Sequence, residues 1–268
     1  MRWAARGALL LALAPGAGDA TAQAREVVLA TTTSVRDAGL LDSLLPPFER
    51  RARISVRVIA VGSGQAMALG RRGEADILIL HDPEGEARFV AEGYGLERQP
   101  LMHNEFVLVG PPADPAGVRG RGAVEAFRAI ARAGAPFVSR GDRSGTHEKE
   151  RRLWALAGVE PSRAWYREAG QGMGATLLIA DQLRAYTLTD VGTLLAHKAP
   201  LELAILVEGD SVFRNPYHVI LVNPERFPRT RAEEARALRD YLLSAEAQRA
   251  IGEFRKGEFG RALFVPER

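Results

Sequence analysis

The residues best suited to chemistry lie in one stretch, V-S-R-G-D-R-S-G-T-H, at Val138–His147. It combines a fixed cation, Arg140, with the hydroxyls of Ser144 and Thr146 and with two glycines that leave backbone N–H groups uncovered. An apolar run precedes the stretch and an amphipathic segment follows it, which predicts a strand, a turn and a helix. The first N–H groups of a helix lack internal partners and lie at the positive end of its dipole. Such a turn is therefore suited to binding an anion.

Three further polar turns repeat this design, each after an expected strand and before an expected helix. Hydroxyls, uncovered N–H groups or both occur in every one. They are Thr32-Thr33-Ser34, Gly62-Ser63-Gly64 and Gly170-Gln171-Gly172-Met173-Gly174-Ala175-Thr176. In the four turns, only Arg140 or Arg143 carries a full positive charge, so neutral donors would surround one cation. This combination favours a small dianion that only accepts hydrogen bonds. Because bonds to charged groups contribute about 1.5–3 kcal/mol each, several of them allow sub-micromolar affinity.

Each turn also has a purely structural interpretation. Serine and threonine before a helix are common caps, and the glycines can serve as turn residues. Arg140 could pair with Asp142 or Glu168 and have no other role. The occurrence of all four turns in one chain favours the binding interpretation.

Two enzyme-like patterns overlap with these turns. The segment Gly170–Ala175, with Asp190 about twenty residues on, fits a loose dinucleotide-binding fingerprint, but the strand before it is short and polar. Ser144 and His147 suggest a hydrolase, yet G-D-R-S-G is not the nucleophile elbow G-x-S-x-G. We expect Ser144 to cap the helix and His147 to lie on the surface.

Two other local patterns have simpler interpretations than catalysis. His81 and Asp82 are too few to form a metal site, so we expect them to be solvated or to line the rim of a cleft. Glu148 and Arg152 have the spacing of an ordinary ion pair between successive turns of a helix.

The first 24 residues have the features of a secretory signal peptide. Arg2 and Arg6 precede the short apolar segment Gly7–Ala14, and Ala22-Gln23-Ala24 is a small-residue cleavage site, so the mature chain would begin at Arg25. The apolar segment is too short to span a bilayer, which needs about 20 residues. These features predict an exported protein, in the periplasm of a bacterium with two membranes.

Composition excludes several other classes. The 268 residues include no cysteine, which rules out disulfides, thiolate metal sites, a catalytic thiol and a lipid-modified cysteine. The formal charge of +3 is spread among acidic residues without a basic block, so we expect no nucleic-acid binding.

Strands and helices are expected to alternate along the chain, which is typical of parallel α/β sheets. Expected strands include Glu26–Ala30, Ile54–Val61 and Ala75–Leu80, and Pro46-Pro47 should kink or end the first helix. Two apolar runs stopped by proline, Phe106–Pro111 and His218–Pro224, enclose about a hundred residues of the same alternation. The middle of the chain therefore looks inserted into a lobe built from both ends. Ligands bind in the cleft between such lobes, beyond the carboxyl ends of the strands.

With these turns in view, the sequence resembles the periplasmic tungstate-binding proteins of bacterial ABC transporters over nearly the whole mature chain. Serine replaces the threonine common in one family motif, and both supply a hydroxyl. The matching segments are A-T-T-T-S (Ala30–Ser34), V-G-S-G-Q-A (Val61–Ala66), H-D-P-E (His81–Glu84), V-S-R-G-D-R-S-G-T-H (Val138–His147), E-A-G-Q-G-M-G-A-T (Glu168–Thr176), Y-T-L-T-D (Tyr186–Asp190), V-E-G-D (Val207–Asp210) and N-P-Y (Asn215–Tyr217).

The resemblance implies a two-lobed α/β fold of the type II periplasmic binding class, each lobe a mainly parallel sheet flanked by helices, with two crossover strands. One lobe would comprise residues 25–108 and 217–268, and the other residues 109–216. A tetrahedral oxyanion would be held between the lobes by hydroxyls, backbone N–H groups and an arginine. Carried over by motif, the binding residues would be Thr33, Ser34, Ser63, Arg140, Ser144, Gly145, Thr146, Met173 and Gly174.

The expected function is thus that of a non-enzymatic binding protein, a monomer without cofactor or protein-bound metal cation. It would capture tungstate and deliver it to a permease driven by a cytoplasmic ATPase. Molybdate, sulfate and phosphate remain alternatives on the same fold, because the preference for tungstate rests on the resemblance alone. Asp142 could accept the proton of a phosphate ion.

Overall fold

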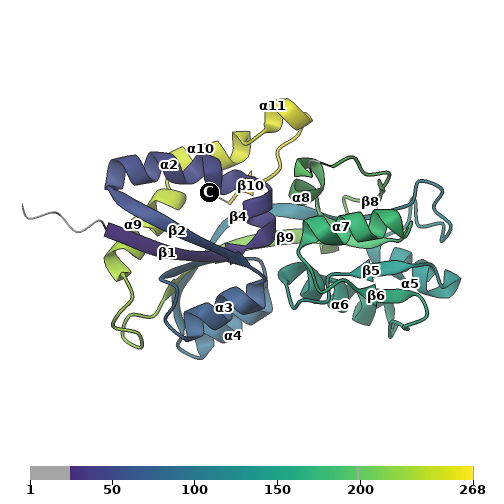
Figure 1. Ribbon diagram of the computed structural model, residues 1–268, viewed down its shortest axis with the longest axis horizontal. Helices are drawn as coiled ribbons and strands as arrows, with labels where there is room; N and C mark the ends of the chain where they lie inside the picture. Colours follow the sequence, from purple (N-terminus) through teal and green to yellow (C-terminus); the bar gives the residue numbers. More distant parts are fainter. Residues whose placement is uncertain (1–24, 198, 268) are drawn as a thin grey trace, which may run out of the picture.

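The computed structural model describes residues 25–197 and 199–267, whose elements form two groups joined by long strands (Figure 1). The signal-peptide prediction for residues 1–24 lies outside the described residues. Within the described part of the chain, no helix is both long and apolar enough to cross a membrane.

The first group is built on a sheet with the strand order β10-β4-β9-β3-β1-β2. Its strands are β1 (Arg25–Thr32), β2 (Ile54–Val61), β3 (Ile77–Leu80), β4 (Gly95–Gly110), β9 (Arg214–Val222) and β10 (Val265–Pro266). β1 pairs in parallel with β2 and β3, whereas β9, β4 and β10 add antiparallel pairs. The expectation of a mainly parallel sheet therefore holds only for its β3-β1-β2 part. The sheet is mixed because β4 leaves the first group and β9 returns to it beside β4 in the opposite direction.

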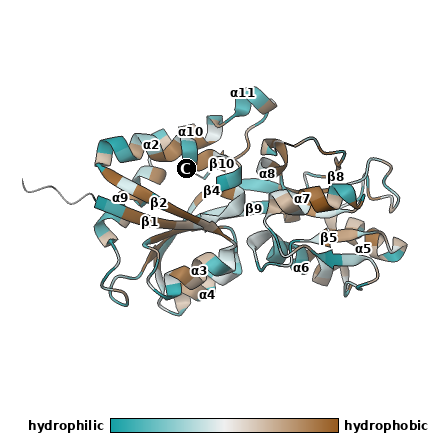
Figure 2. Ribbon diagram, in the orientation of Figure 1, coloured by the Kyte–Doolittle hydropathy of each residue, from teal (hydrophilic) through white to brown (hydrophobic). Residues whose placement is uncertain are grey.

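Helices cover both faces of this sheet, as Figure 1 shows for α2 and α10 on one side and α3 and α4 on the other. Alternate residues of β1 face opposite sides of the sheet. Val27 and Leu29 pack in the core with α2, α9 and α10. Val28 and Ala30 pack in the core with α3 and α4. Apolar residues are accordingly concentrated in β1 and β2 (Figure 2). The helices are α1 (Thr33–Asp37), α2 (Leu40–Ala52), α3 (Ser63–Arg71), α4 (Pro83–Ala91), α9 (Ala232–Leu242), α10 (Ala245–Glu253) and α11 (Lys256–Phe259).

The first long helix, α2, does not end at its two prolines. It continues through Pro46 and Pro47 to Ala52, so of the two expected outcomes, a kink or an end, the end is wrong. Leu44, Leu45 and Phe48 on either side of the prolines are buried in the core. This packing outweighs the backbone hydrogen bonds that the prolines cannot donate.

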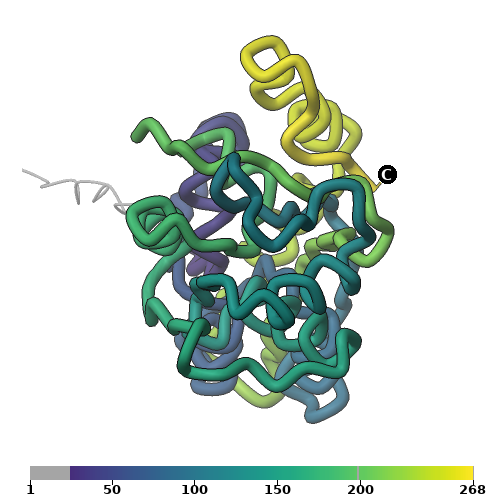
Figure 3. The backbone as a smooth tube through the Cα atoms, turned by 90° about the vertical axis from the view of Figure 1, so that its right-hand side faces the viewer, coloured from purple at the N-terminus to yellow at the C-terminus, as the bar shows by residue number. Residues whose placement is uncertain are grey.

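The second group contains the middle of the chain and faces the viewer in Figure 3, where its teal and green segments lie in front. The end of β4, from Phe106 on, pairs antiparallel with β7 and β8, and β5 pairs in parallel with β6. Phe127, Phe137 and Trp154 pack edge to face in its core. Its elements are α5 (Ala123–Ala133), β5 (Phe137–Ser139), α6 (Gly145–Ala157), β6 (Tyr166–Glu168), α7 (Met173–Gln182), β7 (Thr187–Asp190), α8 (Val191–Ala196), β8 (Ala204–Val207) and a 3-10 turn, η1 (Ser211–Phe213).

Candidate functional site

All four polar turns lie where a strand ends and a helix begins, as the sequence predicted. Two turns start α1 and α3 in the first group, and two start α6 and α7 in the second. The turns of the two groups meet. A Cβ atom placed on Gly62 would lie 3.5 Å from the Cα atom of Ser144, and one on Gly172 would lie 3.9 Å from Oγ1 of Thr33. Donors from the N-terminal part of the chain and from its middle thus surround one region.

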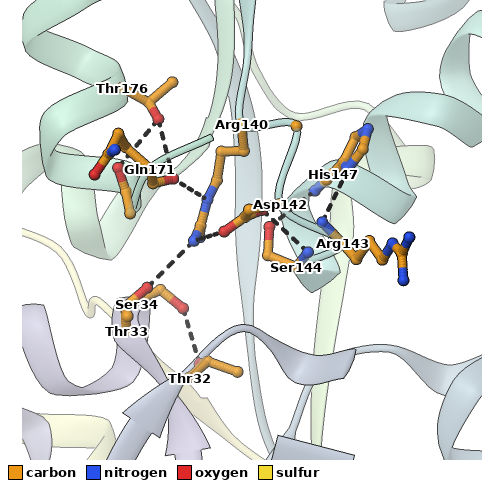
Figure 4. A network of polar contacts seen from close by, with 12 residues as sticks. Thr32, Thr33, Ser34, Arg140, Asp142, Arg143, Ser144, His147, Gln171 and Thr176 are labelled. Carbon is orange, nitrogen blue, oxygen red and sulfur yellow. Dashed lines mark hydrogen bonds and ion pairs between the residues drawn. The ribbon is translucent and has the colours of Figure 1, made fainter. Parts of the chain in front are cut away.

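Arg140 is the cation of this region, and only 2% of its surface is exposed. Its Nε donates to the carbonyl of Gln171 at 3.3 Å, and Nη2 donates to the Thr33 hydroxyl at 3.5 Å (Figure 4). Nη2 also forms an ion pair with Asp142, the pairing that the sequence left open. By contrast, Arg143 is exposed and its guanidinium points away from the cluster in Figure 4. The guanidinium of Arg140 therefore links turns of both groups, whereas Arg143 meets the first group near Gly64, where an added Cβ would lie 3.2 Å from the Arg143 carbonyl oxygen.

The hydroxyls of the turns fall into two kinds, those with hydrogen-bond partners and those without. Ser34 lies 3.0 Å from the Thr32 hydroxyl, and Ser144 Oγ accepts the His147 N–H at 3.2 Å, which confirms the predicted helix cap. Ser63 Oγ and Thr146 Oγ1 are fully buried and have no hydrogen-bond partner among residues 25–197 and 199–267. A buried hydroxyl left unsatisfied costs about 1–3 kcal/mol. These two hydroxyls are therefore donors suited to a ligand.

Backbone N–H groups complete the donor set. Gly145 and Met173 are the first residues of α6 and α7, and Gly174 is the second of α7, so their N–H groups have no partner inside the helix. Gly145 must be glycine here, because an added Cβ would lie 2.8 Å from the His81 carbonyl oxygen. The helix dipoles of α6 and α7 add positive potential at the same place.

His81 is 3% exposed, so it is not solvated, but it lines a cavity of about 320 Å³ together with Asp82, in agreement with the expected place at the rim of a cleft. Two other expectations from the sequence are wrong. His147 is not a surface residue but 8% exposed. Glu148 pairs with Arg151, whereas Arg152 pairs with Glu84 of the first group. Only the tertiary structure brings Glu84 near α6, so spacing within the helix could not reveal this partner.

The geometry does not support the two enzyme patterns. Nδ1 of His147 accepts the Arg143 N–H at 3.1 Å, and the contact between His147 and Ser144 Oγ is through the backbone N–H. The imidazole is therefore not placed as a base for Ser144. Asp190 caps α8 and accepts hydrogen bonds from Thr193 and Asn104 with no exposed surface, so it is not available to a ribose. Among the described residues, no group of three or more metal-binding side chains occurs.

The sequence did not predict that His81 contacts the second group. It follows β3 directly and lies against Gly145 of the second group. Its place just after a buried strand, as for the four polar turns, was the available signal, but its partner Asn215 is 134 residues away in the sequence.

The chain is similar to proteins of a known family over most of its length. The PBP superfamily domain matches residues 17–246. The chain is 46% identical to the tungstate-binding protein TupA of Peptoclostridium acidaminophilum, covering 90% of this chain and 85% of the relative. The structure of the tungstate ABC transporter from Geobacter sulfurreducens is 47% identical, covers 85% of this chain and 98% of its own, and has a TM-score of 0.79.

The tungstate-binding protein TupA from Desulfovibrio alaskensis G20 is 42% identical over 91% of this chain and 99% of its own, with a TM-score of 0.76. These relatives are named as binding proteins or transporter components. The chain therefore belongs to the PBP superfamily and, within it, to the family of the TupA tungstate-binding proteins.

Proposed function

We propose that the protein is the tungstate-binding component of an ABC transporter and is not an enzyme. The observation that carries this proposal is the pair of buried, unpartnered hydroxyls, Ser63 and Thr146, which come from opposite groups and lie at turns that meet around Arg140. A dianion whose oxygens only accept hydrogen bonds satisfies such donors. The names and high identities of the relatives support tungstate as that dianion.

In this proposal the two groups are lobes that close on the anion. One lobe comprises residues 25–108 and 217–268, the other residues 109–216. Hydroxyls of Thr33, Ser34, Ser63, Ser144 and Thr146, N–H groups of Gly145, Met173 and Gly174, and the guanidinium of Arg140 hold the oxyanion. Because these donors come from both lobes, the bound anion stabilises the closed arrangement.

We further propose that the protein works in the periplasm after removal of residues 1–24, as a monomer that delivers the anion to a permease with its cytoplasmic ATPase. The close sequence similarity to a chain from a solved tungstate ABC transporter supports this role. No cofactor and no protein-bound cation enters the mechanism, since the tungsten arrives inside its oxyanion.

Calorimetric titration with sodium tungstate tests the function. We expect saturable heat with one anion per chain at micromolar protein, and the absence of heat would refute the proposal. Molybdate, sulfate and phosphate are the competing ligands. Asp142 already accepts from Arg140 and from the Ser144 N–H at 3.1 Å, so its carboxylate is engaged rather than waiting for the proton of a phosphate. We therefore expect phosphate to compete much more weakly than molybdate.

A further inference from the structure

A chain of buried side chains connects the two groups beside the candidate site. It runs from His81 at the end of β3, through Asn215 of β9 and Asn104 of β4, to Asp190 at the end of β7. At most 3% of the surface of any of these four residues is exposed. Since β4 and β9 are the strands that join the two groups, this chain lies where the groups are connected.

The direction of every hydrogen bond in this chain follows from its last member. The Asp190 carboxylate accepts, so Asn104 Nδ2 must donate to it, at 3.0 Å. The Asn104 oxygen is then left to accept from Asn215 Nδ2 at 2.7 Å, which turns the Asn215 oxygen toward Nδ1 of His81 at 2.9 Å. Nδ1 of His81 therefore carries a proton. In the neutral imidazole, Nε2 is consequently the unprotonated nitrogen.

This Nε2 atom is buried and has no hydrogen-bond partner in the described part of the chain. The imidazole nevertheless lies beside the anion donors. A Cβ added to Gly145 would lie 2.8 Å from Cε1 of His81. The imidazole also stacks on the ring of Tyr217, with 4.7 Å between the ring centroids, and the Tyr217 hydroxyl is hydrogen-bonded to Ser34. A cavity of about 320 Å³ is lined by His81, Gly145 and Asn215, among other residues.

The charges around the site leave a dianion incompletely neutralised. Arg140 is paired with Asp142, so these two side chains together contribute no net charge. Asp190 and Glu86 favour the protonated imidazole, whereas Arg140 disfavours it, and Tyr217 stays neutral because burial raises its pKa. Burial is the largest effect and lowers the pKa of His81 below its ordinary value of 6.5. Without an anion, His81 is therefore neutral at pH 7.5.

We propose that His81 is an additional anion-binding residue, which takes up one proton at Nε2 when the oxyanion enters and donates this new N–H to it. The proton comes from solvent, Nδ1 keeps its own proton and its bond to Asn215, and the imidazolium supplies the missing positive charge. Loading is thereby linked to proton uptake. This inference rests on the proposed binding of tungstate.

The test is calorimetric titration with sodium tungstate at pH 7.5, in buffers with different ionisation enthalpies such as Tris and imidazole. We expect the observed heat to vary with the buffer, with a slope approaching one proton taken up per anion. Between pH 7 and pH 8.5, the affinity should fall by up to tenfold for each unit of rising pH. Heat that is the same in all buffers would overturn the inference but leave tungstate binding intact, whereas no heat at all would refute the proposed function.

Variants of His81 test whether this residue takes up the proton. His81→Asn keeps a donor near Nδ1 but removes Nε2, so we expect about 10- to 100-fold weaker binding and buffer-independent heat. His81→Gln can donate from near the Nε2 position without titrating, and should recover affinity but not proton uptake. The control is His103→Asn, which removes a histidine paired with Glu267 outside the site and should keep the wild-type slope. Proton uptake that persists in both His81 variants would overturn the assignment, and the wild-type buffer series remains decisive if a variant fails to fold.

Discussion

Nη2 of Arg140 lies 3.5 Å from the Thr33 hydroxyl, although 107 residues separate the two in sequence. Thr33 begins α1 after the first strand, and Arg140 follows β5 in the middle of the chain. A single side chain thus connects turns of both groups. An anion that bonds Arg140 and the hydroxyls of the first group would hold these turns together in the same way.

Replacing Arg140 should abolish tight binding. Arg140→Ala removes a buried cation together with its charge-assisted hydrogen bonds, and it leaves the Asp142 carboxylate unpaired beside the anion. Two such bonds at about 1.5–3 kcal/mol each correspond to a loss of at least about 100-fold in tungstate affinity. Titration calorimetry measures this directly.

Arg143→Ala is the matched control for this substitution. Arg143 has the same charge, lies three residues away and is exposed. Its removal should change the affinity by less than about threefold, as expected for a solvated charge. Similar losses in the two variants would refute the assignment of Arg140.

Removal of the unpartnered hydroxyls should have opposite effects on thermal stability and on tungstate affinity. Ser63→Ala and Thr146→Val remove buried hydroxyls that have no partner in the described residues, so without ligand the melting temperature should stay the same or rise. Tungstate affinity should fall by about 10- to 100-fold in each variant, because a donor to the anion is lost. Thermal unfolding with and without tungstate gives both quantities. Lower stability without ligand, with unchanged affinity, would show that these hydroxyls are structural.

Local sequence patterns predicted the four turns well because each depends on a strand end, a helix start and small polar residues within a few positions. Ser144 illustrates this, since its capping bond to His147 spans only three residues. The pattern could not predict that β9 and β4 pair antiparallel beside β3, or that Arg152 meets Glu84. These features depend on how distant segments pack. The role of His81 was hidden for the same reason, because its partner Asn215 lies 134 residues away.

Gly145 should not tolerate a side chain. Gly145→Ala would place Cβ 2.8 Å from the His81 carbonyl oxygen and 2.8 Å from Cε1 of its ring, so the two groups could not approach as they do here. We expect at least about tenfold weaker tungstate binding, with the fold retained because the glycine lies at a helix start. Calorimetry and circular dichroism measure the two effects. Gly257→Ala, where an added Cβ meets nothing within 4 Å, should bind normally, and normal binding by Gly145→Ala would contradict this close approach.

The ion pair between Glu84 and Arg152 should contribute little to binding. It joins α4 of the first group to α6 of the second, but 65% of the Glu84 side chain and 46% of the Arg152 side chain are exposed. Exposed pairs contribute about 0–1 kcal/mol, so Glu84→Gln should weaken tungstate binding by no more than about fivefold, and less at high salt. The exchange Glu84→Arg with Arg152→Glu should restore the affinity measured for the wild type. A much larger, salt-independent loss would mean that this contact controls closure.

Because of Glu150, the free energy of unfolding should fall as the pH rises. Its carboxyl is buried on α6, where Oε1 accepts from Trp154 Nε1 at 3.1 Å and from the Tyr166 hydroxyl at 2.8 Å. Burial raises its pKa from 4.5 to about 7. Between these two values the folded state holds a proton that the unfolded state releases, so the free energy of unfolding falls as the pH increases and the loss is complete above pH 7.

The size of this loss is on the order of 3 kcal/mol, from about 1.4 kcal/mol for each unit by which the two pKa values differ. Glu150→Gln keeps an oxygen for both donors but does not ionise, so its melting temperature should decline less than that of the wild type between pH 5 and pH 8. Thermal unfolding monitored by circular dichroism over this range measures the difference, with the exposed Glu253→Gln as a control that should follow the wild type. Parallel curves for wild type and Glu150→Gln would show that the Glu150 carboxyl remains ionised inside the fold. In that case its two donors compensate for the burial of its charge.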